Sequence, residues 1–220
     1  MKIEGCEFPD DVFYEPEGLV WARLDGPSAV VGITSIHAAL GGKLTKVAAR
    51  PTGLAFEAGR AIGTLEGSRY FGPIRTPISG ILERVNDGVL SRPRVMSESP
   101  YGVGWFARVR PARWSEERNR LLAAPEAIPP LRAQIAALHV RCFAAFPDYE
   151  MVEIGTECAA VLIRLDGLLA EIDLDEVVHI VSDDPTAPIE MVRWSDRSGQ
   201  PVVDTRREGD LYHFLVRKAR

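Results

Sequence analysis

The stretch that most constrains the fold of this chain runs from residue 64 to residue 80. Gly67, Gly72 and Pro73 stand in its middle between two short apolar runs, with Arg69 at the centre. Because glycine adopts positive φ and proline fixes φ, this pattern predicts a tight β-hairpin with one long basic side chain at its tip. A second proline and a Ser-Gly pair in the following arm predict that this arm bends away from a regular ladder.

Many short strands separated by turns surround this hairpin in the first half of the chain. Two apolar runs, residues 19–24 and 29–33, flank an Asp-Gly pair at 25–26, which predicts a hairpin. A short helix is expected to follow, with Thr34 or Ser35 as its N-cap and Gly41 as its stop. Further strands are expected over residues 43–49, 56–62 and 81–86. This pattern predicts a small folded-over β-sandwich.

These residues resemble the H protein of the glycine cleavage system and its lipoate-binding relatives in sulfur oxidation. The resemblance covers about residues 7–125. It implies an H-protein-like lipoyl-domain β-sandwich of the barrel-sandwich hybrid type, followed by helices. The matching residues are Trp21, Glu66, Gly72, Pro73, Pro77, Ser79, Gly80 and the segment 100–106.

Arg69 occupies the position at which this family carries its lipoylated lysine. Lipoylation needs a neutral, nucleophilic amine, and the guanidinium stays protonated because its pKa lies above about 12. The resemblance therefore implies a carrier fold without its swinging arm, and no lipoyl cofactor is expected. The alternative is that Arg69 is one more solvated charge on a turn. Lys43 and Lys46 leave open a third interpretation, a lipoyl carrier modified elsewhere, while Glu66 is either structural or faces a partner.

Two helices are expected between the β-rich region and the second half of the chain. The first covers residues 115–124 and stops at Pro125, with acidic residues in its first turn. The second follows a Pro-Pro pair and carries an apolar stripe to residue 146. The stripe consists of Leu131, Ile135, Leu138, Cys142 and Phe146. We expect a domain boundary near residue 147, which gives domains 1–147 and 148–220.

The second domain is expected to have a different architecture, a two-layer α/β unit of the order βαβαββ with both helices on one face of the sheet. The whole chain is therefore assigned to the α+β class. The expected elements are a strand at 150–154, a helix at 158–172, a strand at 176–182, a helix at 185–196, and strands at 200–205 and 211–218.

This second domain resembles the TusA-type sulfur carriers over about residues 150–218. The matches are a Gly-x-x-Cys motif ending at Cys158, the Asp183-Asp184-Pro motif and the closing strand Tyr212–Lys218. The resemblance implies that Cys158 carries a persulfide without a metal or an organic cofactor. Asp183 and Asp184 are interpreted first as a helix start and second as an acidic patch that faces a partner.

The position of Cys158 at a helix N-terminus favours the thiolate, which is the form that attacks a donor persulfide. Two features oppose this. Glu157 would raise the thiol pKa. The family also follows its cysteine with Pro-x-Pro, where this chain has residues 159–161, Ala-Ala-Val. The alternative is a small buried cysteine at the start of an apolar helix.

Composition excludes several function classes. The net charge of −5 gives no electrostatic case for binding nucleic acid or a membrane surface. Three irregularly spaced cysteines predict no disulfide framework, and a reducing cytoplasm is the expectation. His139 and Cys142, one helical turn apart, are expected on a buried helix face rather than in a metal site.

The leading hypothesis is a non-lipoylated H-protein-like adaptor that relays sulfur through Cys158. Its partners would be proteins of sulfur transfer or proteins that recognise lipoyl carriers. The alternative is a non-catalytic scaffold or docking protein in which both carrier positions are degenerate. No Ser/His/Asp set, phosphate loop or metal cluster points to an enzyme beyond sulfurtransferase-type transfer.

Overall fold

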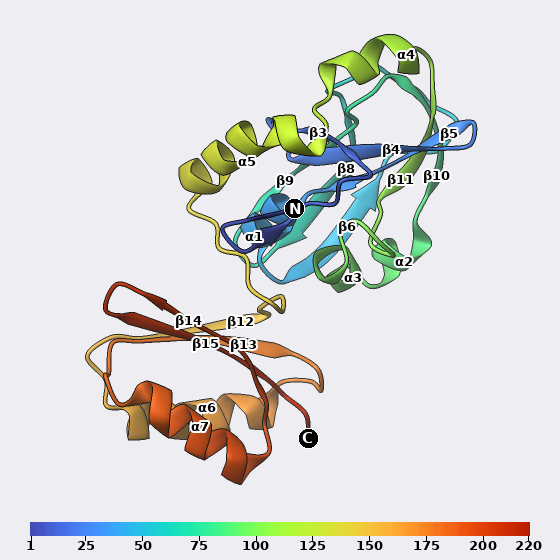
Figure 1. The fold of residues 1–220 in the computed structure, drawn as a ribbon. Coiled ribbons are helices and arrows are strands. Elements are labelled where there is room, and N and C mark those ends of the chain that lie inside the picture. The colour runs from blue at the N-terminus through green and yellow to red at the C-terminus, as the bar shows by residue number, and fades with distance from the viewer. The chain divides into compact units, whose positions relative to one another are not determined.

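The computed structural model describes residues 1–220 and divides into two compact units, Met1–Cys142 and Phe143–Arg220. Figure 1 shows the first unit in blue to yellow and the second in yellow to red. Each unit has its own sheets and its own core.

Unit 1 contains a six-stranded sheet of order β3-β4-β5-β11-β10-β7, a three-stranded sheet of order β6-β8-β9 and the small pair β1-β2. All of these strand pairs are antiparallel. The strands are β1 (Lys2–Ile3), β2 (Cys6–Glu7), β3 (Phe13–Glu15), β4 (Val20–Asp25), β5 (Ser28–Ile33), β6 (Leu44–Ala49), β7 (Ala55–Phe56), β8 (Ala61–Gly67), β9 (Phe71–Arg75), β10 (Gly80–Val85) and β11 (Ala107–Pro111). The helices are α1 (Ser35–Gly41), α2 (Asp87–Ser91), α3 (Arg94–Glu98), α4 (Trp114–Glu117), the 3₁₀ turn η1 (Arg118–Arg120) and α5 (Ala124–Leu138).

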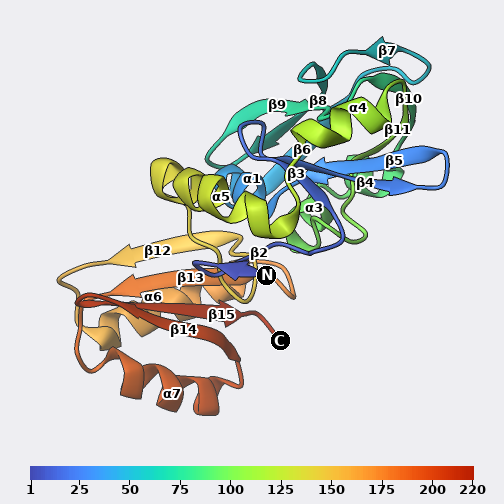
Figure 2. The same ribbon diagram turned by 45° about the horizontal axis from the view of Figure 1, so that its top comes forward.

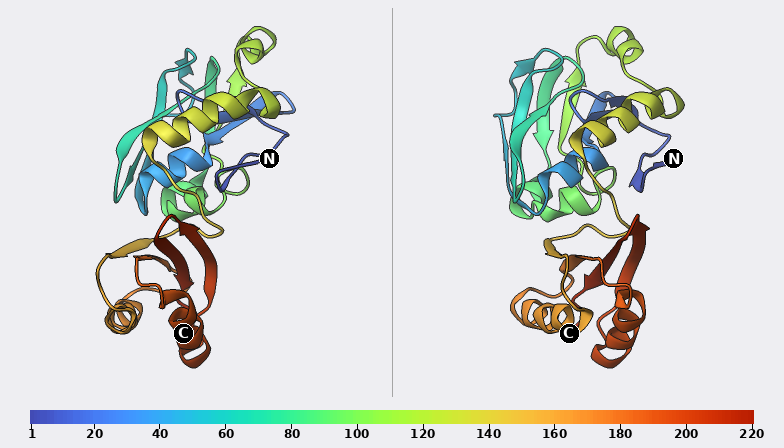
Figure 3. Two further views of the ribbon diagram at one scale, coloured as in Figure 1. Left: turned by 60° about the vertical axis from the view of Figure 1, so that its left-hand side comes forward. Right: turned by 90° about the vertical axis from the view of Figure 1, so that its left-hand side faces the viewer.

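The two larger sheets pack face to face, as the right panel of Figure 3 shows. Gly63 of β8 lies against Phe106, so close that a β-carbon there would stand 2.3 Å from the ring. Trp21 is fully buried, and its indole N–H donates to the Ile33 carbonyl at 2.9 Å. The buried side chains of both sheets form the sandwich core predicted from the sequence.

Local signals in the sequence correctly predicted most of the elements of this unit. The hairpin of β4 and β5 turns at Gly26, and α1 begins after Thr34, whose hydroxyl accepts the N–H of His37 at 3.4 Å. The single strand expected over residues 56–62 is wrong. A turn at residues 57–60 divides it into β7 and β8, which belong to different sheets.

The helix expected up to residue 146 is also wrong in its bounds. Helix α5 begins at Ala124 and ends at Leu138, with His139 in the left-handed conformation at φ 51°. Pro125 is tolerated because it lies in the first turn, where backbone N–H groups have no helical partner. The helix continues through Pro129 and Pro130, and its buried residues Ala127, Leu131 and Ile135 join the core.

Cys6 and Cys142 form a disulfide, which contradicts the expectation of no disulfide and of a buried helix face at residues 139–142. Their separation of 136 residues in the sequence hid this pairing, because only the folded unit brings both segments together. With one disulfide present, cysteine usage no longer supports a reducing compartment.

Unit 2 has the expected order of elements. Its sheet has the order β12-β13-β15-β14, in which β12 is parallel to β13 and the other pairs are antiparallel. Figure 3 shows that both helices lie on one face of this sheet. The elements are β12 (Tyr149–Glu153), α6 (Cys158–Glu171), β13 (Val177–Ser182), α7 (Ala187–Ser198), β14 (Val202–Glu208) and β15 (Leu211–Arg217).

Candidate functional site

The hairpin of β8 and β9 has its tip at residues 68–70, as expected from the sequence. The tip is not free. The Ser68 N–H donates to the Lys43 carbonyl at 2.9 Å, and the Lys43 N–H donates to the Ser68 hydroxyl at 3.1 Å. The Arg69 N–H donates to the Gly41 carbonyl at 3.2 Å. These bonds fasten the tip to the last residue of α1 and to the segment just before β6.

The Arg69 side chain lies back on α1 instead of extending into solvent as a carrier arm would. Its Nη2 donates to the carbonyl of Ala39, in the last turn of α1, at 2.8 Å. Helix α1 has no basic residue of its own in that turn. Because the last carbonyls of a helix lack helical partners and carry partial negative charge, a guanidinium there stabilises the helix end.

Two glycines make this close packing of the tip possible. Gly42 has φ of 68°, and a β-carbon there would stand 2.4 Å from the Ser68 hydroxyl and 3.0 Å from Nε of Arg69. Gly67 approaches the Gly41 carbonyl so closely that its β-carbon would stand 2.2 Å from the oxygen. Any side chain at either position would displace the tip from the helix end.

A buried histidine lies beneath the tip. His37 of α1 is 2% exposed, and its ring packs edge-on against Tyr70 with 5.8 Å between the ring centroids. Burial lowers the pKa of His37 to about 4, since a charged imidazolium would lose its hydration there. The imidazole is therefore neutral at pH 7.

The structure also places the other residues singled out near this hairpin. Glu66 is exposed on β8, and in the strand register it stands opposite Lys46 of β6. Lys43 lies outside the hairpin sequence, but its backbone is bonded to Ser68, one residue from Arg69. The bond from Arg69 to Ala39 was not predicted. The Gly-Gly pair that ends α1, together with the absence of a basic residue in its last turn, was the available signal.

Cys158 is the first residue of α6 and is only 4% exposed. Its N–H donates to Oδ2 of Asp184 at 2.7 Å, and the N–H of Gly155 donates to Oδ1 of Asp183 at 2.8 Å. Asp184 also accepts from the N–H and the hydroxyl of Thr186. The two aspartates that follow β13 thus hold the loop before α6, and these bonds bring Asp183, Asp184 and Cys158 together.

Cys158 follows the alternative of a small buried cysteine at the start of an apolar helix, not the expected thiolate. Burial of the sulfur raises the thiol pKa to about 11, and the carboxylates of Asp184 and Glu190 add to this shift. The positive end of helix α6 does not offset this increase in the pKa, because the backbone N–H of Cys158 already donates to Asp184. The same bonds, first those from Thr186 and then that from Cys158, hold the pKa of Asp184 below its usual range. The sulfur is a buried thiol at neutral pH.

Unit 2 contains a second polar cluster that the sequence did not indicate. His179 of β13 and His213 of β15 are buried, with 3.0 Å between their facing ring nitrogens. Glu150 of β12 lies 3.1 Å from the other nitrogen of His179, and the Phe143 ring packs on the same imidazole. No set of three His, Cys, Asp or Glu side chains in the chain is arranged to hold a metal ion.

The fold and the hairpin define a class. A β-sandwich that presents one residue at a hairpin tip is the architecture of the lipoyl-domain carriers. The glycine cleavage H-protein family matches residues 12–132, more than half of the chain. The chain belongs to this family.

Two relatives found by sequence agree with this assignment. The probable glycine cleavage system H protein 2 of Sulfolobus acidocaldarius is 34% identical over 146 residues, which are 64% of this chain and 97% of the relative. The glycine cleavage system H protein 5 of Aquifex aeolicus is 28% identical over 145 residues, 64% of this chain and 98% of the relative. Among solved structures, a glycine cleavage system H protein from Mycobacterium marinum has 25% identity and a TM-score of 0.49, covering 60% of this chain and all of that one.

The family match lies within unit 1, so the resemblance of residues 150–218 to sulfur carriers remains a prediction. The expected cytoplasmic location also remains a prediction. None of the helices combines the length and the apolar character that a membrane crossing requires.

Proposed function

We propose that this chain is a docking adaptor, an H-protein fold that binds the partners of lipoyl carriers without carrying a lipoyl group. The observation that supports this proposal is the position of Arg69. A guanidinium stands where the family presents an amine, and it is bonded to the Ala39 carbonyl instead of being free to move. The partners would be enzymes that recognise H proteins, as in the glycine cleavage system for which the relatives are named.

Lipoylation in a lipoylating host tests the chemical part of this proposal. The parent protein is expected to keep its unmodified mass, while Arg69→Lys, which restores the amine, gains one lipoyl group. Intact-mass spectrometry measures both. A lipoyl adduct on the parent protein would overturn the proposal. Repeating the measurement with Lys43→Arg and with Lys46→Arg would then show which of the two lysines named by the third interpretation carries it.

Binding tests the docking part. An adaptor should bind a glycine cleavage enzyme that accepts H proteins, and it should compete with a lipoylated H protein for that enzyme. Titration of the purified enzyme with the parent protein measures this directly. Competition that disappears when Glu66 and Lys46, two exposed charges of the hairpin sheet near the tip, are exchanged for alanine would support docking through this face. Absence of any competition contradicts it.

A second candidate is sulfur relay through Cys158. The support for it is local: the sulfur stands at the start of α6, and the loop before it is held by Asp183 and Asp184. The burial of the thiol means that a donor reaches it only when this loop opens. Incubation with a persulfide donor should then add sulfur to the parent protein and not to Cys158→Ala. An unchanged mass of the parent leaves the docking adaptor as the better account.

A further inference from the structure

A cavity lies at the end of the β8–β9 hairpin opposite Arg69. The strand register pairs Ala61 with Arg75 at this end, whereas the tip is at residues 68–70. The cavity has a volume of about 570 Å³ and is open to solvent. Its principal lining residues are Arg50, Leu54, Phe56, Glu57, Arg60 and Arg75. Figure 2 shows β7, which provides one wall, at the edge of unit 1 and away from α1.

The cavity concentrates positive charge in a chain whose net charge is −5. Three guanidiniums line it, and none of them has a carboxylate partner: Arg50, Arg60 and Arg75. The one acidic residue of the lining, Glu57, is neutralised by Arg113, with Nη2 at 2.7 Å from Oε2. Like charges gathered without counter-charges repel each other, and an anion bound among them would relieve this repulsion.

The turn between β7 and β8 and the end of β9 form the charged wall of the cavity, and hydrogen bonds hold this wall in place. Nη1 of Arg75 donates to the Gly59 carbonyl at 2.9 Å, which fixes that guanidinium at the rim. The Gly59 N–H donates to the Thr76 carbonyl at 2.7 Å, and the Thr76 N–H donates to the Arg60 carbonyl at 2.9 Å. The turn between β7 and β8 is therefore fastened to the end of β9. A preorganised site loses less free energy to ordering when it binds a ligand.

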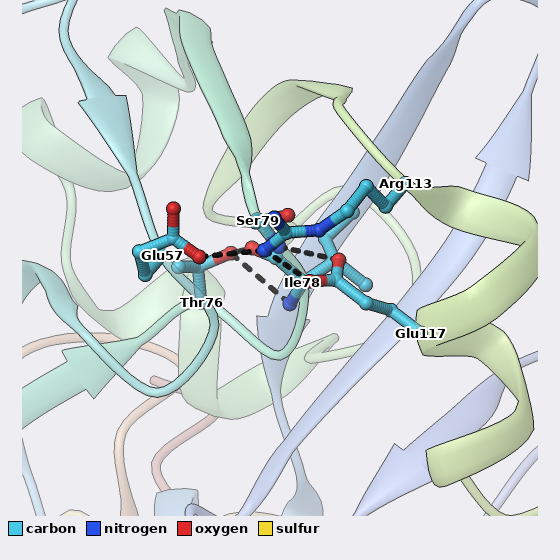
Figure 4. Close-up of polar contacts among 6 residues, drawn as sticks. All are labelled: Glu57, Thr76, Ile78, Ser79, Arg113 and Glu117. Atoms are coloured by element: carbon cyan, nitrogen blue, oxygen red, sulfur yellow. Dashed lines mark hydrogen bonds and ion pairs between the residues drawn. The ribbon is translucent and has the colours of Figure 1, made fainter.

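A buried carboxylate supports this wall from α4, as Figure 4 shows. Glu117 is 4% exposed and accepts the Ser79 N–H at 2.7 Å. Its other oxygen lies 3.4 Å from Nη2 of Arg113, the group that binds Glu57. Glu57 is thus paired with Arg113 rather than with the three cavity arginines.

The lining between the charges is apolar. Leu54 is 47% exposed, and the ring of Phe56 and the methyl group of Ala61 are partly buried beside it. We infer that this cavity binds a small organic anion, a phosphate or carboxylate group on an apolar body. The guanidiniums would take the anionic group by bidentate hydrogen bonds, and Leu54 and Phe56 would cover the body. This site is separate from the tip at Arg69 and does not depend on the docking proposal.

The test is an NMR titration of the full ¹⁵N-labelled chain with phenyl phosphate. Benzoate, inorganic phosphate and benzyl alcohol serve as comparison probes. Phenyl phosphate should shift the amide signals of residues 50–61 and 75–76, and benzoate will show whether a carboxylate is accepted as well. Benzyl alcohol, which lacks the charge, should not bind. Absence of shifts with both organic anions overturns the inference. Equal affinity for inorganic phosphate and phenyl phosphate overturns the assignment of an organic ligand and leaves a simple anion site.

Variants locate the binding. Arg60→Gln and Arg50→Gln should each lower the affinity for phenyl phosphate roughly tenfold, because each removes a charge-assisted hydrogen bond. Arg84→Gln is the matched control, since Arg84 is an exposed arginine of the same unit outside the lining. Thermal unfolding establishes that each variant is folded, and two independent variants keep the test valid if one fails. An equal loss of affinity in Arg84→Gln, or no loss in the two cavity variants, contradicts the inference.

Discussion

Arg69 and Cys158 stand at the two positions where this chain could carry a group. Each lacks one of the two properties that a carrier atom needs, which are exposure to solvent and chemical reactivity. Arg69 is exposed at a hairpin tip but has no amine that could form an amide. Cys158 has a suitable atom, but it is buried and its thiol pKa is raised to about 11. A carrier needs both exposure and chemical competence at the same atom. The comparison shows that a carrier fold can persist while its carrier position loses either its exposure or its reactivity.

The largest expected effect concerns the thiol. A pKa of about 11 in place of the ordinary 9.0 lowers the thiolate population at pH 7.5 about 100-fold, so Cys158 should react with a disulfide reagent much more slowly than an exposed thiol. A suitable comparison is Ile163→Cys in the Cys158→Ala background, because Ile163 is 73% exposed on the same helix. Stopped-flow absorbance measures both rates. Equal rates would break the comparison and favour sulfur relay.

The next effect concerns the histidine beneath the tip. Since the folded pKa of His37 is about 4, below the ordinary value of 6.5, the unfolded chain binds the proton first as the pH falls. Stability from the neutral ring is complete above pH 6.5 and is lost progressively down to pH 4, by about 3 kcal/mol. Between pH 7 and pH 4, the free energy of unfolding should therefore fall by about 3 kcal/mol less in His37→Leu than in the parent protein. Urea unfolding at the two pH values measures it, with His139→Asn, at an exposed histidine, as the control.

The smallest effect concerns Arg69 itself. Arg69→Ala removes the bond to the Ala39 carbonyl and should lower the free energy of unfolding by about 1 kcal/mol. Arg84→Ala, another exposed arginine of unit 1, should change it by less than about 0.5 kcal/mol. Denaturant unfolding distinguishes the two. If both variants match the parent protein, Arg69 is only a solvated charge, the alternative that the sequence left open.

The sequence predicted unit 2 almost element by element, because its signals are local. The apolar helix from Cys158, the valine-rich β13 and the closing strand each have a clear pattern within their own residues. In unit 1 the hairpin of β4 and β5 was equally local and equally well predicted, and so was the helix cap, expected at Thr34 or Ser35 and found at Thr34.

The errors arose where distant segments meet. The end of α5 at Leu138 and the pairing of Cys6 with Cys142 depend on packing that no short window contains. The sequence left the thiol pKa of Cys158 open for a related reason. Its position on a helix is a local property, whereas its burial and the carboxylate of Asp184 come from the assembled unit. The candidate residues were visible in the sequence, but their accessibility was not.

The disulfide between Cys6 and Cys142 has a mechanical consequence. It joins the first strands of the chain to the last residue of unit 1. A stretching force applied between the N-terminus and unit 2 therefore passes through the sulfur–sulfur bond. The 135 residues between the two cysteines, the carrier fold among them, stay outside the line of tension. A pull on the intact chain would extend unit 2 and the segment next to it, while the sandwich remained slack until the bond was reduced.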